Sequence, residues 1–345
     1  MSKLKLLIIS LIAIGIAIWI FGCSDSGTGP VSGTSKLSAG SKININLGGI
    51  SFNMVYVPAK KTFVGNGDTI SVTVTRPFLI GETEVTYALW NIVYTWATDT
   101  SRGSNRYYFQ NVGRIGSGNS GSILQPVTYV SWRDAMVWCN ALTEWYKAMT
   151  ADTNFKCVYK YSGDILRDSR NTNATACDNA TMDSVIGFRL PLENEWELAA
   201  RYKVDRNNDG DIQDSAEFYP WNFASGAYTY NNDTADVNPK NGIVDGKDAN
   251  DAVAVYGYYW DGTSWVATGV ISTAPAKSKN PNSLGIYDMS GNVFELCSDI
   301  VTRSTRAGRG GWYSSYSYTI NVAYYTTYNT TSSGPGVGFR VACSQ

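Results

Sequence analysis

The chain has 345 residues, with 28 lysines and arginines against 29 aspartates and glutamates, for a net charge of -1. This balance provides no long-range field for nucleic acid or for an anionic membrane surface, so neither is expected as an electrostatic partner. The chain contains no histidine, which removes the usual general base and the commonest transition-metal ligand. Its 23 tyrosines and 11 tryptophans, by contrast, can fill both cores and binding surfaces.

The first residues resemble a bacterial export signal. Two lysines precede an apolar run over residues 6–21, which is shorter than the about 20 residues of a spanning helix. The run ends in Ile20-Phe21-Gly22-Cys23, which resembles a lipobox. We therefore expect residues 1–22 to be a lipoprotein signal peptide and Cys23 to carry the lipid anchor; an uncleaved membrane anchor is the alternative. Both place the remainder outside the cytoplasm, and Ser24 favours the outer membrane or cell surface.

Residues 23–45 are rich in serine, glycine and threonine and should form a flexible tether. The remaining residues, 46–345, show no repeat and no second linker, which indicates one large domain. β-branched alternation predicts strands over 54–58 and 70–75. Helical spacing predicts helices over three later segments, 82–97, 131–149 and 191–202. Long loops separate these elements, so the expected class is a loop-rich α+β domain.

The helix starts carry capping signals. Thr83 can cap the first helix, and Ser131 with Asp134 resembles a capping box for the second.

The cysteines other than Cys23 are five in number, an odd count for an oxidising compartment. Cys157 and Cys177 flank a polar segment and are candidates for a disulfide. The pairing of Cys139, Cys297 and Cys343 stays open, because spacing alone does not determine it.

A segment that begins at Asp205 resembles an EF-hand calcium loop. Asp205, Asn207 and Asp209 supply oxygen donors at loop positions 1, 3 and 5, followed by glycine at position 6 and an apolar residue at position 8. Position 12 is Ala216, so the bidentate acid would have to come from elsewhere. Structural Ca²⁺ and a solvated acidic turn are the two interpretations.

Six segments in chain order resemble the formylglycine-generating-enzyme, or sulfatase-modifying-factor, family. They include Met54-Val-Tyr-Val-Pro58, Gly187-Phe-Arg-Leu-Pro191, Leu284-Gly-Ile-Tyr-Asp-Met-Ser-Gly-Asn-Val293 and Gly338-Phe-Arg-Val341. The resemblance spans residues 52–343 and implies a C-type-lectin-like fold. The catalytic members use a copper-binding cysteine pair, yet residues 312–337 contain no cysteine. The related iron-dependent enzymes bind metal through histidines, so neither copper nor iron is expected and the chain should not be an enzyme.

The same resemblance implies a structural calcium site at the segment from Asp288 to Glu295. Asp288 and Glu295 would contribute carboxylates, and Gly291 and Val293 backbone carbonyls. Asn222, after Pro220-Trp221, would belong to a further calcium site by the same resemblance.

The C-terminal part contains an unusual uncharged stretch. From Tyr313 to Gly336, 18 of 24 residues are Tyr, Ser, Thr or Asn, the composition that antibody binding loops use for adaptable contacts. The alternative is an ordinary strand pair with Ile320, Val322 and Val337 as core anchors. The ligand-binding candidates are Trp312, Tyr313, Ser315, Tyr316, Tyr318, Asn321, Tyr324, Tyr325, Thr326, Tyr328 and Asn329.

In layout the chain is similar to variable surface lipoproteins of this fold that are diversified by retroelements, because their variable region occupies the same place.

Three functions follow from these observations. The first is a surface-displayed, non-catalytic lipoprotein that binds a protein or other surface ligand through the C-terminal stretch. The second is a structural lipoprotein of an envelope or motility assembly. The third is a residual enzyme with Cys297 or Cys343 as nucleophile, which lacks a histidine to activate either thiol.

Overall fold

The computed structural model describes residues 37–59, 61–65, 70–118, 121–214, 217–227 and 247–344. The expected signal peptide, Cys23 and most of the tether lie outside these residues. Within the described part, no helix is long and apolar enough to cross a membrane. Residues 37–344 belong to one compact unit, in agreement with a single large domain.

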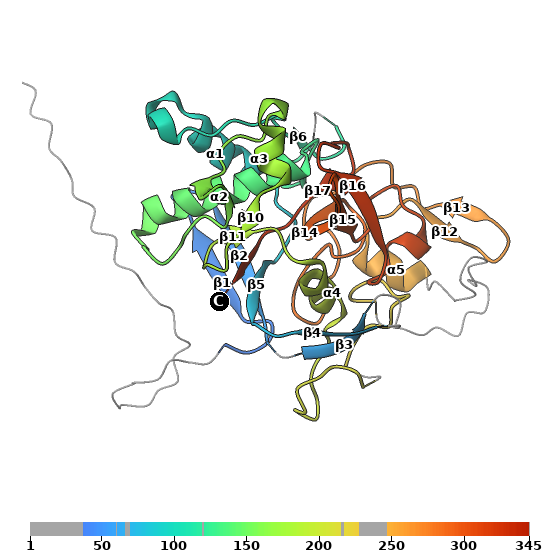
Figure 1. The fold of residues 1–345 in the computed structure, drawn as a ribbon. Helices are drawn as coiled ribbons and strands as arrows, with labels where there is room; N and C mark the ends of the chain where they lie inside the picture. Colours follow the sequence, from blue (N-terminus) through green and yellow to red (C-terminus); the bar gives the residue numbers. More distant parts are fainter. Residues whose placement is uncertain are drawn as a thin grey trace, which may run out of the picture. The chain divides into compact units, whose positions relative to one another are not determined.

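A five-stranded sheet joins the beginning and the end of the domain (Figure 1). Its strand order is β1 (Lys42–Asn46), β2 (Ser51–Val57), β5 (Phe78–Gly81), β18 (Ala342–Ser344) and β11 (Phe188–Arg189). β1 pairs with β2 over all five residues, from Lys42 opposite Val55 to Asn46 opposite Ser51. Residues 42–45, which we expected in the tether, are therefore part of the sheet, because every second side chain of the paired strand can pack on the core.

Two long helices form the first hydrophobic core with this sheet. α1 (Tyr87–Thr98) starts five residues later than predicted, because Thr86 and not Thr83 caps it, its Oγ1 accepting from the amide of Leu89 at 3.3 Å. α2 (Trp132–Thr150) has the predicted capping box, with the Ser131 amide donating to Asp134 Oδ2 at 2.9 Å. The rings of Trp90 and Trp138 stack between the helices with centroids 5.7 Å apart.

The third predicted helix is α4 (Glu193–Arg201), which lies in the second hydrophobic core. Leu192 precedes it and has no hydroxyl to cap it. Instead the Leu192 amide donates to Glu195 Oε2 at 2.9 Å, and both oxygens of Glu195 accept from Arg189, at 2.7 and 2.8 Å. The carboxylate of Glu195, within the first turn, therefore supplies the cap. A negative charge is favourable at a helix N-terminus because the amide groups there are unpaired.

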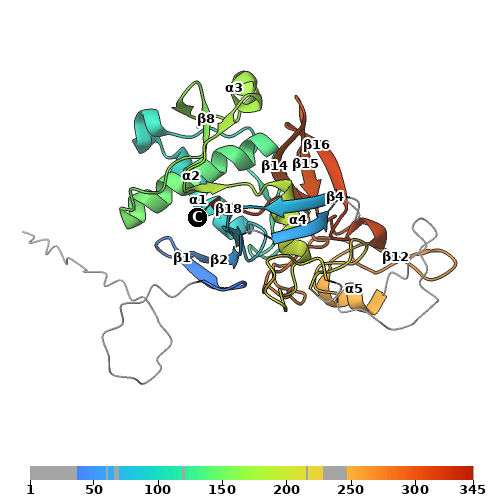
Figure 2. The same ribbon diagram turned by 60° about the horizontal axis from the view of Figure 1, so that its bottom comes forward.

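A second sheet of four strands carries the C-terminal stretch. Its order is β16 (Tyr325–Asn329), β15 (Thr305–Arg309), β14 (Phe294–Thr302) and β17 (Val337–Gly338), with β14 and β17 parallel. These strands lie beside α4 in both orientations (Figures 1 and 2), and residues of β14 and β15 share the second core with α4. β16 is the edge strand, so one side of it has no strand neighbour within the sheet.

The other elements are short. Strand β4 confirms the segment predicted over 70–75. The remaining bounds are β3 (Lys61–Gly65), β4 (Ile70–Val74), β6 (Arg114–Ile115), β7 (Val127–Thr128), β8 (Tyr159–Tyr161), β9 (Asp164–Ile165), β10 (Thr181–Met182), β12 (Tyr258–Trp260), β13 (Trp265–Ala267), α3 (Ala174–Asp178) and α5 (Lys247–Val253).

The disulfide expected between Cys157 and Cys177 is absent, and all five cysteines of the described part are free and buried. The two thiols point to different parts of the backbone. Cys157 Sγ donates to the carbonyl of Asn140 at 3.5 Å, and Cys177 Sγ donates to the carbonyl of Asp168 at 3.2 Å. Cys157 and Cys177 flank the same polar segment in the sequence, but their sulfur atoms lie in different surroundings.

Candidate binding surface

The tyrosine-rich segment, residues 312–336, leaves the end of β15 and returns at β17, and glycines define both of its ends. Gly311 has φ +73°, and a Cβ atom there would lie 2.6 Å from the carbonyl oxygen of Thr319. A Cβ atom on Gly336 would lie 1.9 Å from a ring carbon of Trp312. The first residue of the segment therefore packs directly on its last, and the chain between them includes β16 of the same sheet.

Buried contacts pin the middle of the segment to the scaffold. Ile320 and Val322 are fully buried in two different hydrophobic clusters, and Val337 is buried in a third. Arg309 Nη1 also donates to the carbonyl of Ala323 at 3.1 Å. Ile320, Val322 and Val337 are therefore core anchors, as the strand-pair interpretation predicted. Other residues of the segment remain partly exposed.

The tyrosines divide into exposed and half-buried groups. Tyr316 is 38% exposed and Tyr325 is 50% exposed. Asn329 is also exposed, while the half-buried members are Trp312, Tyr313, Tyr318, Tyr324, Thr326 and Tyr328. The segment thus offers rings and hydroxyl groups to solvent without being a fully solvated loop.

Two of the predicted ligand-binding residues are buried and hydrogen-bonded within the segment, which argues against direct contact of their side chains with a ligand. Ser315 is 4% exposed, and its Oγ accepts from the amide of Trp312 at 3.0 Å. Asn321 is 5% exposed; its side chain donates to the carbonyl of Tyr318 at 2.7 Å and accepts from the amide of Ala323 at 3.1 Å. Both close turns, a common use of short polar side chains that composition alone does not separate from ligand binding.

Strand β16 alternates between a solvent face and a packed face. Tyr325, Thr327 and Asn329 are exposed, whereas Tyr328 packs on Phe294 with centroids 5.4 Å apart. Burial raises the pKa of the Tyr328 phenol, as expected for a hydroxyl withdrawn from water. Tyr328 is therefore mainly a packing residue, and Thr327, which we did not predict, takes its place on the exposed face.

An aromatic hairpin, residues 258–267 of β12 and β13, adds rings that the sequence interpretation missed. The ring of Tyr316 stacks on Tyr258 at 4.9 Å and lies 4.8 Å from Trp265, between ring centroids. Trp265 also contacts Tyr318 at 5.5 Å and Trp260 at 5.4 Å. We call the rings of Tyr258, Trp260, Trp265, Tyr316 and Tyr318 the aromatic surface.

Main-chain contacts hold this hairpin against the segment. The amides of Gly257 and Tyr258 both donate to the carbonyl of Ser315, at 2.9 and 3.0 Å. A Cβ atom on Gly257 would lie 2.9 Å from Cα of Ser314, so only glycine allows this approach. The signal in the sequence was Asp261-Gly262 between the aromatic residues 258–260 and the apolar residues 265–267, which is a hairpin pattern.

The calcium ligands expected at 288–295 are in part engaged with the chain itself, while the buried Asp288 Oδ1 has no hydrogen-bond partner among the described residues. Both carboxylate oxygens of Glu295 accept from Arg340, and Oε2 also accepts from Trp196 Nε1 at 2.7 Å. Asp288 Oδ2 accepts from the amide of Lys277 at 2.9 Å, and burial raises the pKa of Asp288 to about 6. The guanidinium of Arg340 thus neutralises Glu295, one of the two carboxylates expected to bind the ion.

The backbone amides of this segment also bond within the chain, whereas the groups expected to bind the ion are the carbonyls of Gly291 and Val293. The amide of Val293 donates to Glu84 Oε1 at 3.1 Å, and the amide of Gly291 donates to the carbonyl of Gly310 at 2.7 Å. Asn222 is half-buried in the turn after Trp221. Across the described ranges, no three histidine, cysteine, aspartate or glutamate side chains are placed to hold a metal ion by themselves.

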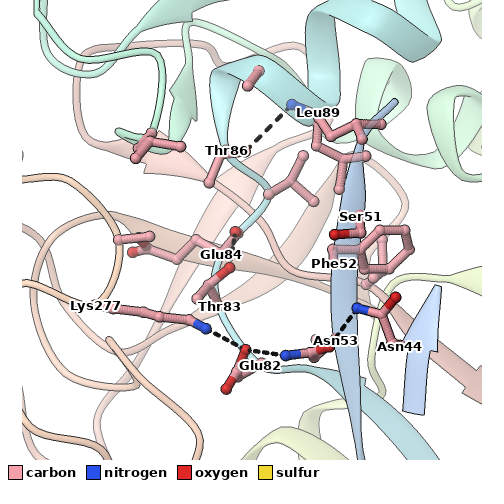
Figure 3. A pocket seen from close by; sticks show the side chains of 17 residues that line it. Asn44, Ser51, Phe52, Asn53, Glu82, Thr83, Glu84, Thr86, Leu89 and Lys277 are labelled. Atoms are coloured by element: carbon pink, nitrogen blue, oxygen red, sulfur yellow. Dashed lines mark hydrogen bonds and ion pairs between the residues drawn. The ribbon is translucent and has the colours of Figure 1, made fainter. Parts of the chain in front are cut away.

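A separate cavity of about 370 Å³ lies beside β2 and residues 81–89 (Figure 3). Glu82 faces it, and its carboxylate accepts from Asn53 at 2.9 Å and pairs with Lys42 and Lys277. Burial alone would raise the pKa of Glu82, but the two ammonium groups outweigh it and the pKa is lowered. The carboxylate that faces the cavity is thus already paired with two exposed lysines, and the described lining of the cavity includes no residue of the tyrosine-rich segment.

The buried thiols are poor candidates for catalysis. Burial raises the pKa of Cys343 to about 11 and that of Cys297 well above its ordinary value. A thiol is nucleophilic as its thiolate, which such burial suppresses. Neither residue lies in the tyrosine-rich segment.

Comparison with known proteins fits this geometry. The model of the sulfatase-modifying factor enzyme 1-like domain matches residues 50–345. The chain belongs to this family. Among solved structures, it is similar to Treponema denticola variable protein 1, with 25% identity, a TM-score of 0.59 and coverage of 88% of this chain and 99% of that one. The C-type-lectin-like α+β fold of the formylglycine-generating-enzyme type is thereby confirmed.

The curated relatives differ in how much of the chain they cover. The chain is 26% identical to chaperone protein LppX of Paenibacillus barcinonensis over 276 residues, which is 78% of this chain and 80% of that one. The formylglycine-generating enzyme of Streptomyces coelicolor is 29% identical over 178 residues, only 45% of this chain and 46% of the enzyme. CarF, a solved structure, is 26% identical with a TM-score of 0.57 over 85% of this chain and 98% of that one.

Proposed function

We propose that this family member is an exported, lipid-anchored, non-catalytic protein that binds a protein ligand through the aromatic surface and the exposed face of β16. The observation that carries the proposal is the contact of Tyr316 with both Tyr258 and Trp265 in a segment without any charged residue. Rigid, partly exposed rings with hydroxyl groups around them give large contact area at a low entropic cost.

The surroundings of the surface support binding over catalysis. The sequence has no histidine to activate a nucleophile, and burial raises the pKa values of the thiols in the described part of the chain, which disfavours thiolate chemistry. The likeness to a variable protein and to a chaperone protein over most of the chain agrees with a binding role. The export signal and the lipidated Cys23 expected from the sequence support a location outside the cytoplasm with attachment to a membrane.

Diversification of the tyrosine-rich segment by a retroelement is a separate part of the proposal. It predicts a reverse transcriptase gene and a near-copy of the segment's coding sequence close to this gene. A genome with neither would refute diversification and leave ligand binding untouched.

Binding is tested with Tyr316→Ala and a matched control. Tyr161, on the hairpin of β8 and β9, is 37% exposed against 38% for Tyr316, so Tyr161→Ala removes a ring of equal exposure elsewhere. The full chain in detergent micelles is titrated against purified surface proteins in an interferometry screen. Tyr316→Ala should weaken the interaction about 30-fold, the size of a hot-spot truncation of about 2 kcal/mol. Equal affinities for both variants would favour a structural lipoprotein whose contact face lies elsewhere.

A further inference from the structure

The EF-hand-like loop of residues 205–217 is closed at its base by short antiparallel pairing. The amide of Lys203 donates to the carbonyl of Glu217 at 2.9 Å, and the amide of Tyr219 donates to the carbonyl of Arg201 at 2.8 Å. This pairing brings loop position 13, Glu217, beside loop position 1, Asp205. The amide of Arg206 then donates to Glu217 Oε1 at 2.5 Å.

The acid missing at position 12 is therefore supplied from position 13. In an EF-hand loop, the last position places a carboxylate opposite the donors of positions 1, 3 and 5. Ala216 cannot do this, but the carboxylate of Glu217 turns back to the start of the loop, as its bond with Arg206 shows. Glu217 stands one position later than the usual acid, and its carboxylate still lies at the start of the loop.

Two carboxylate oxygens at this place are buried without a partner. Glu217 is 1% exposed, and among the described residues nothing donates a hydrogen bond to its Oε2. The side chain of Asp205 is 9% exposed, and its Oδ1 is likewise unpartnered within the described ranges. An unsatisfied buried carboxylate oxygen is costly, so one at each end of the same loop favours a cation that completes their coordination.

The remaining donors follow the order of a calcium loop. Asn207 Oδ1 accepts from the amide of Asp209 at 3.1 Å, and Asp209 Oδ1 accepts from the amide of Asp211 at 3.0 Å. Asp209 Oδ2 accepts from Nδ2 of Asn207 at 2.8 Å, and because both residues are exposed, solvent or an ion can replace this bond. Gly210, at position 6, has φ +93°, which is the sharp turn that this position requires.

Lys61 on β3 supplies a single positive charge to this group. Its ammonium pairs with Asp205 Oδ2, and its side chain is 10% exposed. The sequence of the loop holds five acids, Asp205, Asp209, Asp211, Asp214 and Glu217, against Arg206 and the ammonium of Lys61, so the loop keeps an excess of negative charge.

We propose that the loop binds Ca²⁺ through Asp205, Asn207, Asp209 and Glu217 together with the backbone carbonyl of Asp211, and that Lys61 holds Asp205 when the ion has left. Only hard oxygen donors are offered, which Ca²⁺ accepts in irregular arrays of six to eight and Mg²⁺ does not. Three acids of the described residues do not form a metal site by themselves. The amide, the carbonyl and water complete the shell, and the ion replaces the ammonium at Asp205.

The ion would fasten the loop to the second core. The amide of Ile212 donates to the carbonyl of Thr62 on β3 at 3.0 Å, and the Ile212 side chain is fully buried (Figure 1 shows the loop next to β3). Calcium bound on one side of Gly210 and Ile212 packed on the other would lock α4 and β3 together. The site is therefore structural and separate from the aromatic surface.

Calorimetric titration of Ca²⁺ into the chelator-treated full chain in detergent tests the site. The wild type should bind one ion per loop, with a dissociation constant at or below about 1 mM, as in extracellular modules. Glu217→Gln and Asp209→Asn should each weaken binding at least tenfold; Asp209 is exposed, so its variant keeps the test valid if Glu217→Gln does not fold. Lys61→Met should tighten binding and enlarge the calcium-induced rise in Tm.

Two controls make the outcome specific to this loop. Asp211→Asn should bind as the wild type does, because position 7 offers its backbone carbonyl. Asp288→Asn should also leave binding unchanged, which separates this site from the segment at 288–295. The proposal is overturned if millimolar Ca²⁺ gives neither heat nor a Tm shift, or if Glu217→Gln and Asp209→Asn bind as tightly as the wild type.

Discussion

Glu197→Gln tests whether a buried ion pair holds the binding segment to its scaffold. Glu197 on α4 is 1% exposed, and its Oε2 accepts from Nη2 of Arg309 at 2.7 Å. Its Oε1 accepts from Nε of Arg201 at 2.8 Å. Through its other nitrogen, Arg309 donates to the carbonyl of Ala323, so the pair connects α4 with the tyrosine-rich segment.

The expected loss follows from burial. Glutamine keeps the shape of Glu197 but leaves two buried guanidinium groups with one negative charge fewer, and breaking such a pair costs about 3–5 kcal/mol. Glu193 lies 2.8 Å from the same Nη2 and compensates in part, so we expect a loss of about 3 kcal/mol. Glu193→Gln is the matched control. Its side chain is 26% exposed, and more exposed pairs contribute only about 0–1 kcal/mol.

Guanidinium chloride unfolding of both variants measures these losses, and hydrogen exchange reports on the amides of Val322 and Ala323. The amides should exchange faster in Glu197→Gln while the denaturant slope stays that of the wild type. Equal losses of less than about 1 kcal/mol in both variants would refute the reasoning, because burial would then make no difference to the pair.

Three further predictions concern the aromatic surface and the thiols. Trp265→Ala removes a ring in contact with Trp260, Tyr316 and Tyr318, so ligand affinity in the interferometry assay should fall about 30-fold; unchanged affinity would exclude the hairpin from the site. Gly336→Ala introduces a Cβ atom 1.9 Å from the Trp312 ring and should destabilise the protein by about 1–3 kcal/mol in chemical unfolding, a prediction that a neutral result contradicts. The native thiols of the five buried cysteines should not react with iodoacetamide at pH 8, since burial raises the pKa of Cys343 to about 11 and those of the others further. Alkylation should appear only on denaturation, and fast labelling of the native chain would show that a thiolate is accessible.

Local patterns in the sequence predicted local structure well. The capping box at Ser131 and Asp134 and the core anchors Ile320 and Val322 are found in the structure, because each depends on residues within one turn or on hydrophobicity alone. The fold followed from motifs spread over the whole chain, and no single segment would have been sufficient.

Long-range pairing was beyond such reasoning. Glu295 was expected to bind calcium but is paired with Arg340, 45 residues further along the chain. Cys157 and Cys177 end in different backbone environments. In each case the partner is chosen by the tertiary fold, which brings together residues whose spacing in sequence carries no information about distance.

The division of labour within the tyrosine-rich segment explains how it could vary without unfolding the protein. Its path is set by Gly311 and Gly336 at its ends, by Ile320 and Val322 in the cores, and by the carbonyl of Ala323 on Arg309. Among these contacts, only those of Ile320 and Val322 require an apolar side chain in the segment. The exposed positions at 316, 325, 327 and 329 lie between the anchors and contribute little to either core. Substitutions there should alter which ligand is bound before they alter stability, because a ligand contacts these side chains and the cores do not.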